Sequence, residues 1–350
     1  MIQLRRLALL PAFLALLSCA AVTRAQEYTS IVVFGDSLSD TGNDAHVFSS
    51  IYGIRFPGPI FDYTDGRFTD GIDTFPPAIN YQGVWVDQLA GMIPSHPTVK
   101  NSLDGGTNYA YGFATTGPGT QILAFNSPFG AFQFPVENVG HQIDDYLATH
   151  PRIDRKTLFI VWAGANDVLN ATSQQQIVNA AVTQSGNVER LIEAGATQFI
   201  VPNLPPLGAT PRFNGSPVTA AIANQASALY NSYLAQGLTI VNEANSGKHL
   251  RIFPLDVFTL IGGIIADPTA YGFVNVTSKS QGVYPLNPDT YLFWDDLHPT
   301  THGHNILALT ADQMLTHHAC MQTENNHGDG NGADNGNESD CKVVPVGSGS

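Results

Sequence analysis

The sequence predicts an α/β fold built on a parallel sheet. Short runs of β-branched and aromatic residues, typical of buried strands, alternate with longer segments whose apolar residues recur at helical spacing. Such alternation is typical of βαβ units, whose helices cover a parallel sheet. The chain of 350 residues is 43% hydrophobic and 10% aromatic, which excludes a disordered protein and suffices for one large domain or two ordinary ones.

The first predicted strand runs from Ile31 to Phe34, and Gly35-Asp36 then lets the backbone turn sharply. Further strands are expected over residues 157–162, 198–202 and 249–253, and helices over 177–194, 218–245 and 304–318. Residues 46–135 are rich in Gly, Pro, Tyr and Phe, and this composition predicts long loops over one edge of the sheet, where function usually lies.

The N-terminus has the features of an export signal. Arg5 and Arg6 precede an apolar stretch, Leu7 to Leu17, that is too short for a typical membrane-spanning helix. Cleavage after Ala25 would remove residues 1–25 and give a secreted protein, extracellular or periplasmic. A competing interpretation takes Cys19 as the lipidated cysteine of a bacterial lipoprotein. No other segment of the sequence is long and apolar enough to span a bilayer.

The C-terminal residues 321–350 are polar and of low complexity, so we expect a flexible tail after a domain over residues 26–320. Cys320 and Cys341 would remain after signal removal. In an exported protein this pair favours a disulfide that tethers the tail, with two free thiols as the alternative.

The charge balance argues against two classes of partner. The chain has 15 basic and 29 acidic side chains, a formal net charge of −14. Such an excess disfavours binding to nucleic acid and electrostatic docking on anionic membranes.

Ser37 is a candidate nucleophile. It follows the first strand, at the sheet edge where open α/β sheets bind ligands, and we expect it on the first turn of a helix. A helix start there would supply N–H groups suited to an oxyanion. The alternative is a serine that only caps the helix.

A nucleophilic serine needs a base, and the base needs an orienting group. Asp295 and His298 lie three residues apart in a segment that ends at Pro299. A turn of this length can bring the carboxylate to one imidazole nitrogen while the other nitrogen faces a cavity. The alternative is a capped loop with a surface histidine.

Two further residues are candidate oxyanion donors. Asn166 follows the second strand, so its side-chain amide can reach the same edge as Ser37. Gly112 lies in a Gly- and Tyr-rich segment, where a glycine allows close backbone approach and its N–H could be a second donor.

These blocks together resemble the SGNH, or GDSL, hydrolase family of esterases and lipases. The matching blocks occur in order over roughly residues 30–315: Gly35-Asp36-Ser37-Leu38, Asn108 to Gly112, Gly164-Ala165-Asn166-Asp167 and Asp295 to Pro299. Phe113 stands where many relatives carry a second glycine. The wider first block and Asp65 to Gly71 resemble the plant-lipase-like branch, which includes bacterial secreted phospholipases, haemolysins and acyltransferases.

The resemblance implies a three-layer α/β/α sandwich with a flavodoxin-like parallel sheet. It implies Ser37 as nucleophile, His298 as base and Asp295 as orienter, with an oxyanion hole from the N–H groups of Ser37 and Gly112 and the amide of Asn166. It implies a secreted serine esterase or lipase acting on small-molecule, polysaccharide or lipid esters, with no cofactor. The alternatives are an acyltransferase and a non-catalytic ester- or glycan-binding module.

Other residues have open or structural interpretations. We interpret Asp36, Asn43 and Asp167 as scaffold, and His302 and His304 as solvent-facing or capping residues rather than metal ligands. The following aromatic residues could line an acyl or sugar site or pack the loops together: Tyr52, Phe56, Phe61, Tyr63 and Phe68.

Overall fold

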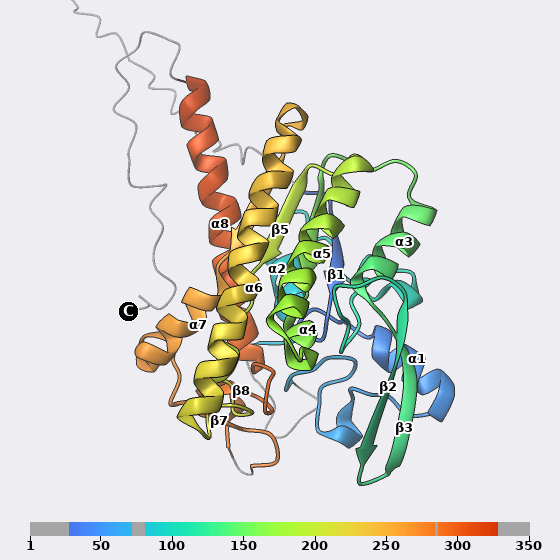
Figure 1. Ribbon diagram of the computed structural model, residues 1–350, viewed down its shortest axis with the longest axis vertical. Coiled ribbons are helices and arrows are strands. Elements are labelled where there is room, and N and C mark those ends of the chain that lie inside the picture. Colours follow the sequence, from blue (N-terminus) through green and yellow to red (C-terminus); the bar gives the residue numbers. More distant parts are fainter. Residues whose placement is uncertain (1–27, 72–80, 284–285, 328–350) are drawn as a thin grey trace, which may run out of the picture.

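The computed structural model describes residues 28–71, 81–283 and 286–327, with side chains as far as residue 316. Its centre is a four-stranded parallel sheet (Figure 1). The strands lie in the order β1 (Ser30–Gly35), β4 (Thr157–Trp162), β5 (Gln198–Pro202) and β6 (Arg251–Leu255). Three of them lie within one residue of the predicted strands, and β6 begins two residues later than expected.

A short extended segment continues the sheet on the free side of β1. Asn108 pairs in parallel with Val33, whose N–H donates to the Thr107 carbonyl (3.1 Å) and whose carbonyl accepts from the Tyr109 N–H (2.8 Å). The second segment along the chain therefore lies outside the first, which is the 2-1-3-4-5 order of flavodoxin-like sheets. The predicted fold class is confirmed.

Helices cover both faces of the sheet and give three layers (Figure 1). One face carries α2 (Trp85–Met92), α7 (Val257–Ala266) and α8 (Thr301–His327). The other carries α3 (Val139–Thr149), α4 (Ala165–Asn170), α5 (Gln174–Glu193) and α6 (Pro217–Ala244).

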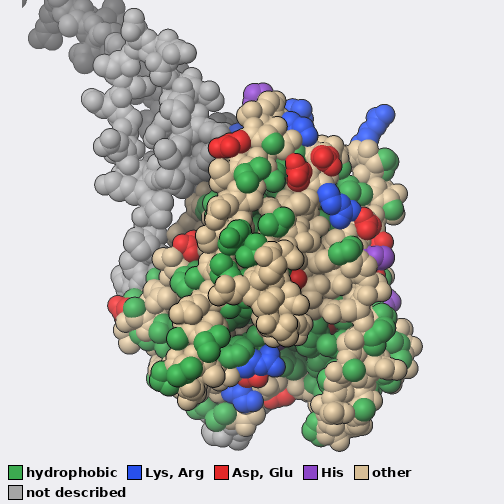
Figure 2. Space-filling view, in the orientation of Figure 1, with side chains coloured by type: hydrophobic (Ala, Val, Ile, Leu, Met, Phe, Trp, Pro, Cys, Tyr) green, Lys and Arg blue, Asp and Glu red, His purple; other side chains and the backbone are tan. Residues whose placement is uncertain are grey.

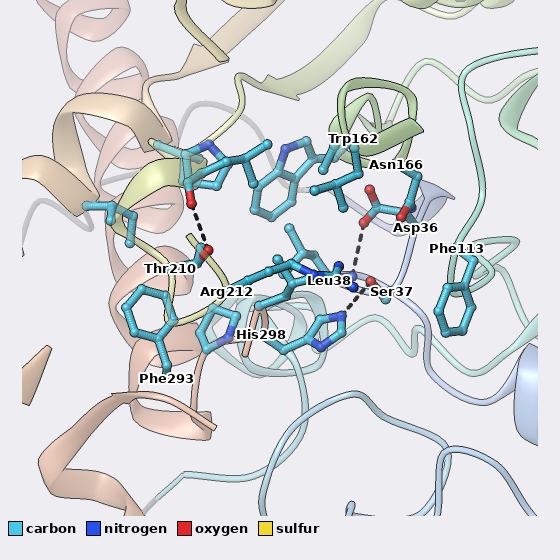
Figure 3. Close-up of a pocket in the computed structure, with 18 of the residues that line it drawn as sticks. Asp36, Ser37, Leu38, Phe113, Trp162, Asn166, Thr210, Arg212, Phe293 and His298 are labelled. Atoms are coloured by element: carbon cyan, nitrogen blue, oxygen red, sulfur yellow. Dashed lines mark hydrogen bonds between the residues drawn. The ribbon is translucent and has the colours of Figure 1, made fainter. Parts of the chain in front are cut away.

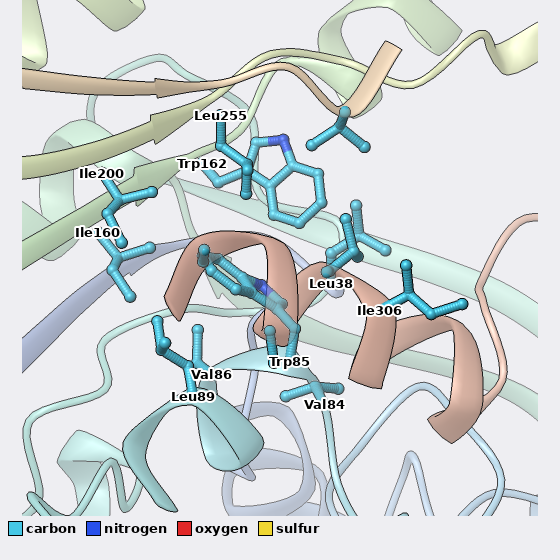
Figure 4. Packing of buried hydrophobic residues seen from close by; sticks show 14 of the residues in the cluster. Leu38, Val84, Trp85, Val86, Leu89, Ile160, Trp162, Ile200, Leu255 and Ile306 are labelled. Atoms are coloured by element: carbon cyan, nitrogen blue, oxygen red, sulfur yellow. The ribbon is translucent and has the colours of Figure 1, made fainter. Parts of the chain in front are cut away.

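The strand side chains alternate between these two layers. Ile31 and Val33 belong to the cluster with α2 and α8, part of which Figure 4 shows, whereas Val32 and Phe34 pack against the opposite helices. Both faces are buried, which explains why the strands are continuous apolar runs instead of alternating ones.

The expectation of long loops over residues 46–135 is wrong in part. This region contains most of α1 (Asn43–Tyr52), all of α2, and most of an antiparallel hairpin of β2 (Thr120–Ser127) and β3 (Gly130–Glu137). An aromatic cluster buries the inner side of the hairpin against α1 and the loops around it. The aromatic composition therefore reflects a third core rather than surface loops.

Shorter elements complete the described chain. They are the parallel pair β7 (Asn275–Lys279) and β8 (Tyr291–Phe293), and the 3-10 turns η1 (Pro59–Phe61), η2 (Ser102–Asp104), η3 (Leu207–Ala209), η4 (Ser246–Lys248), η5 (Pro268–Tyr271) and η6 (Pro288–Thr290). Helix α8 continues to His327, so residues 321–327 of the expected tail are helical.

Several expectations concern parts outside this description. The export signal over residues 1–25, Cys19 and Cys341 lie outside the described residues, and the side chain of Cys320 is not described. Within the described ranges, no helix combines the length and the apolar character needed to cross a bilayer.

A buried glutamine of α3 fixes the end of β1. The Gly35 N–H donates to Gln142 Oε1 (2.9 Å), and Gln142 Nε2 donates to the Gly35 carbonyl (2.9 Å). Gln142 has no exposed surface. Its side-chain amide thus takes the place of a neighbouring strand at the residue where β1 leaves the sheet, two positions before Ser37.

We expect Gln142→Leu to lower the free energy of unfolding by about 1–3 kcal/mol, because it leaves the buried N–H of Gly35 without a partner, whereas the Gly35 carbonyl keeps the N–H of Tyr111. Urea unfolding followed by circular dichroism measures the loss. Gln236→Leu is the matched control, because Gln236 is an exposed residue of α6 whose amide contacts only Ser232. Equal unfolding midpoints for the two variants would contradict this role of Gln142.

Candidate active site

Ser37 lies in a single turn that follows β1, not in a helix as expected. The Asp36 carbonyl accepts the N–H groups of Ser39 and Asp40 (both 3.0 Å), and Asp36 Oδ1 accepts the Leu38 N–H (3.1 Å). The turn ends there, and the next helix, α1, begins only at Asn43.

The Asp40 carboxylate explains why the chain changes direction after this turn. Asp40 Oδ1 accepts the N–H groups of Gly42 (2.7 Å) and Asn43 (2.8 Å), and Oδ2 accepts that of Asp44 (3.2 Å). Asp40 therefore caps α1 and separates this helix from the turn that presents Ser37.

Ser37, His298 and Asp295 form one hydrogen-bonded chain (Figure 3 shows the first two). His298 Nε2 lies 2.8 Å from Ser37 Oγ, and His298 Nδ1 lies 2.6 Å from Asp295 Oδ2. Ser37 comes from the end of β1, and the other two come from the loop between β8 and α8. This is the geometry that lets an imidazole take a proton from a serine while a carboxylate orients the ring.

The loop around Asp295 is itself held by that carboxylate. Asp295 Oδ1 accepts the N–H groups of Leu297 and His298 (both 2.7 Å). Tyr63 adds a hydrogen bond that no local sequence pattern predicts: its hydroxyl donates to Asp295 Oδ2 (2.7 Å) from 232 positions away. Asp295 Oδ2 thus accepts from both His298 and Tyr63.

The titration behaviour of the three acid–base groups follows from burial and from each other. Burial opposes ionisation of Asp295, but the charge of His298 and the hydrogen bonds to the carboxylate lower the pKa of Asp295 to about 2. Burial likewise opposes charging of His298, yet the Asp295 carboxylate raises the pKa of the imidazole above its ordinary value of 6.5. Burial raises the pKa of Asp36, beside Ser37, to about 7.

The imidazole is also held by an aromatic ring. Phe68 stacks on His298 with ring centroids 5.1 Å apart, and Phe68 is fully buried. The aromatic residues that could have lined a binding site instead pack the loops together: Tyr52, Phe56, Phe61, Tyr63 and Phe68 are all members or neighbours of the third core cluster. Among them, Tyr63 contacts Asp295 and Phe68 contacts His298.

Ser37 and His298 open onto a cavity of about 250 Å³ whose wall is mostly apolar (Figure 3). Leu38, Trp162 and Phe293 line it together with aliphatic residues of α4, α7 and α8. Arg212 is the cationic side chain on this wall, and its guanidinium Nε lies 3.7 Å from Asp296 Oδ2. The cavity therefore suits an apolar group placed beside a nucleophile.

The candidate oxyanion donors differ in where they lie. Asn166 lines the cavity and donates through Nδ2 to the Ala114 carbonyl (3.0 Å), which leaves its second amide hydrogen. Gly112 does not line the cavity, and its N–H points toward Asp40 Oδ2 (3.4 Å). This differs from the expected donor role of Gly112.

Gly112 has a packing role instead. A Cβ at this position would lie 2.4 Å from the Phe68 ring and 2.3 Å from Asp44 Oδ2, so only glycine fits. The next residue, Phe113, lines the cavity and has a left-handed backbone, φ 64°. Within the described part of the chain, the N–H groups of Phe113 and Ser37 have no hydrogen-bond acceptor.

Two scaffold residues bond to backbone or neighbouring groups. Asn43 Nδ2 donates to the carbonyls of Asn108 and Ala110 (both 2.9 Å), and Asp167 accepts the N–H and hydroxyl of Thr116. These contacts tie the loop around residues 108–116 to the turns that carry Ser37 and Asn166.

The other two histidines are structural. His304 is fully buried rather than solvent-facing, and its Nδ1 accepts the Trp85 N–H (3.2 Å) at the start of α2. Burial lowers the pKa of His304 to about 3, so the ring is neutral and acts as a cap. His302 Nδ1 contacts the Asp289 carbonyl (2.6 Å).

Among the residues that the structure describes, one group could share a cation, and it lies apart from the cavity. Ligand atoms of Glu137, His141 and Asp145, beside and along α3, lie within 4.8 Å of one another. None of the three lines the cavity at Ser37.

Comparison with known proteins identifies the family. The model of the family described as GDSL-like Lipase/Acylhydrolase matches residues 31–310. The chain belongs to this family. Membership places the protein among hydrolases that act on ester bonds.

Relatives in this GDSL family include bacterial and plant proteins. The chain is 27% identical to Lipase 1 of Photorhabdus luminescens over 85% of its own length and 52% of that protein, so it spans about half of this relative. It is 28% identical to a GDSL esterase/lipase of Arabidopsis thaliana, over 79% of this chain and 84% of the relative. It is 27% identical to a phosphatidylcholine-sterol acyltransferase of Aeromonas hydrophila, over 77% and 70%.

The contacts of Asp295 Oδ2 with His298 and Tyr63 predict how activity depends on pH. Because the pKa of His298 is raised, the neutral base is lost as pH falls, and we expect kcat/KM to decline on an acid limb above pH 6.5. In Tyr63→Phe the carboxylate loses a donor and holds the imidazolium more strongly. The limb should therefore move up by about 0.5–1 pH unit, the equivalent of about 1 kcal/mol.

A pH–rate profile with a soluble p-nitrophenyl ester measures this shift. Tyr233→Phe, a substitution at a partly exposed tyrosine of α6, serves as control and should leave the limb in place. If Tyr63→Phe lowers activity by the same factor at every pH, its hydroxyl does not act through Asp295 and His298.

Proposed function

We propose that this protein is a serine ester hydrolase that works through an acyl-enzyme on Ser37. The observation that carries the proposal is the continuous chain from Ser37 Oγ through His298 to Asp295 at the mouth of an apolar cavity. Family membership supports ester hydrolysis in general. The assignment of each role rests on geometry and chemistry.

The proposed reaction has two halves. Ser37 Oγ attacks the ester carbonyl carbon while its proton passes to His298 Nε2. The tetrahedral intermediate collapses, and the alkoxide leaves with the proton from His298, so the acyl group remains on Ser37. A water molecule then repeats the sequence: its proton goes to His298, its oxygen attacks the acyl carbon, and Ser37 regains its proton.

We propose that the negative oxygen of the intermediate is held by the Ser37 N–H, the Asn166 amide and the Phe113 N–H. Phe113 replaces Gly112 in this set because Phe113 lines the cavity, whereas the Gly112 N–H faces Asp40. The left-handed backbone of Phe113 is a strained conformation for a bulky residue, as found where a loop is held for function.

We propose that the cavity binds the acyl part of the substrate. Its wall next to Ser37 is mostly apolar, and an acyl chain can lie there without loss of hydrogen bonds. Esters of simple alcohols, polysaccharides and lipids share this acyl part, so the proposal covers all three.

We expect Ser37→Ala to lower kcat/KM for p-nitrophenyl butyrate by about 10⁴-fold or more, since the nucleophile and its proton transfer are both lost. Ser50→Ala, at an exposed serine of α1, should keep full activity. A fluorophosphonate probe should label the wild type at Ser37 and not label the alanine variant. Undiminished hydrolysis by Ser37→Ala would refute the nucleophile, and an unlabelled wild type would favour a non-catalytic binding module.

We expect Asn166→Ala to reduce kcat by about 10²–10³-fold with little change in KM, because an oxyanion donor acts on the transition state. Steady-state kinetics separate the two parameters, and thermal unfolding checks that loss of the bond to Ala114 has not disturbed the fold. A rise in KM at constant kcat would instead mean that Asn166 only binds substrate.

Acyl transfer to an alcohol is a second candidate. It is supported by the similarity to the phosphatidylcholine-sterol acyltransferase of Aeromonas hydrophila, and the same residues would serve it. Product analysis with an added alcohol distinguishes the two, since a transferase gives the new ester in place of the free acid.

We also propose that the enzyme is exported and that residues 1–25 are removed. The charged start and the short apolar stretch of the sequence support this. Mass spectrometry of protein from the culture medium tests it, and a chain that begins at Gln26 is the expected product.

A further inference from the structure

The β2–β3 hairpin presents an exposed face without charge. Every second residue of β2 is exposed, and the strands pair along their whole length. Ile122 on this face is 65% exposed and Phe129 at the turn is 60% exposed. We call the following residues the outer face of the hairpin, with Phe129 as its exposed tip, whose ring also contacts that of Phe61 (centroids 5.5 Å apart): Ile122, Ala124, Asn126, Ala131, Gln133 and Pro135.

The absence of charge extends well beyond this face. Residues 105–136 contain no Asp, Glu, Lys, Arg or His, although 13% of the chain is Asp, Glu, Lys or Arg. In Figure 2 the surface over β2 and β3, at the lower right, accordingly carries hydrophobic and neutral side chains. Exposed strands are normally protected from association by charged residues, and the charged residue of this hairpin is Glu137, at the last position of β3.

The hairpin is anchored, so its outer face has a fixed direction. Phe134 and Val136 on the inner side are buried, and Phe132 lies 5.0 Å from the Phe48 ring. The Tyr52 hydroxyl donates to the Gln133 carbonyl (2.8 Å) and accepts the Gln133 N–H (3.0 Å). The outer face is therefore an apolar surface on a firmly packed element.

This surface adjoins the cavity at Ser37. Gln121 and Leu123, which alternate with Ile122 along β2, line the cavity. Strand β2 is therefore a wall one strand thick, with the outer face on one side and the cavity on the other.

From these observations we propose that the outer face of the hairpin docks on the surface of lipid whose head groups carry no net charge. The net charge of −14 disfavours anionic lipid, while apolar side chains without charge suit insertion between neutral or zwitterionic head groups. The apolar cavity on the other side of the same strand favours a lipid surface over a protein partner, because lipid can supply an acyl chain to that cavity.

The test is co-sedimentation of the full chain with phosphatidylcholine vesicles. Ile122→Asp and Phe129→Asp are made separately, since Phe129 lies in the turn outside the strand pairs and should tolerate substitution if Ile122 does not. Ile240→Asp is the matched control, because Ile240 is 66% exposed and belongs to α6, a helix that packs on the central sheet and not on the hairpin. The series is measured in the Ser37→Ala background, so that the lipid stays intact.

We expect the Ser37→Ala parent to bind the vesicles. Each hairpin variant should bind them with an affinity lower by about tenfold or more, and Ile240→Asp should bind like the parent. Phosphatidylglycerol in the vesicles should weaken binding at low salt. No binding by the parent, or an equal loss in Ile240→Asp, would overturn the proposal. So would a concentration-dependent dimer that the hairpin variants abolish, because the face would then serve a second copy of the chain.

These experiments test docking on lipid and catalysis at Ser37 separately. Vesicle binding by Ser37→Ala does not depend on the identity of the nucleophile, so the docking proposal can hold if the catalytic one fails. Hydrolysis of soluble p-nitrophenyl butyrate by the hairpin variants, with Ser37 restored, detects damage to the cavity. A loss there equal to the loss of vesicle binding would overturn docking as the explanation.

Discussion

The buried carboxylate of Asp40 is the constraint on which the arrangement of the site depends. It accepts backbone N–H groups of Gly42, Asn43, Asp44 and, at 3.4 Å, Gly112. The first three start α1 immediately after the turn that carries Ser37, and the fourth draws in the loop that ends at the cavity. One side chain thereby sets the spacing between Ser37 and the loop that carries Phe113, the proposed oxyanion donor.

Three buried carboxyl groups of this region have different pKa values, because their hydrogen-bonding and charged partners differ. Asp295 has an imidazole and two backbone donors, which outweigh burial and keep the pKa at about 2. Asp40 has only neutral backbone donors, and burial raises its pKa to about 6. Asp44 lies next to Asp40, and both burial and the charge of Asp40 raise its pKa well above the ordinary value. Of the three, Asp295 is the carboxyl group whose partners favour the ionised form most strongly, and it is the one that contacts His298.

Much of this organisation could be predicted from local sequence, because each element has a local cause. Apolar runs ended by Gly35 or Gly164 place strand ends at one sheet edge, and the three-residue spacing of Asp295 and His298 permits their contact. Tyr63 and Gln142 could not be found in this way. Their partners, Asp295 and Gly35, lie 232 and 107 positions away, and no periodicity of the sequence encodes such contacts.

The hairpin and the turn at Ser37 were missed for a different reason. The glycines and prolines around β2 and β3 suggested loops, but the register that makes a hairpin here comes from Phe134 and Val136 packing into an aromatic core. Similarly, the residues after Ser37 are compatible with a helix, and only the capping of α1 by Asp40 decides against it. In both places tertiary contacts outweigh the local preference.

The same hairpin connects the interior of the protein with its surface. Its inner side chains support the loops that carry Tyr63 and Phe68 against the hydrogen-bonded chain, and Leu123 extends the cavity wall. Its outer side chains face solvent without charge. Since neighbouring residues of a strand point to opposite faces, any surface that binds Ile122 lies on the other side of the strand from the group that Leu123 contacts. The alternation of β2 therefore places one strand in contact with both the cavity and the outside surface.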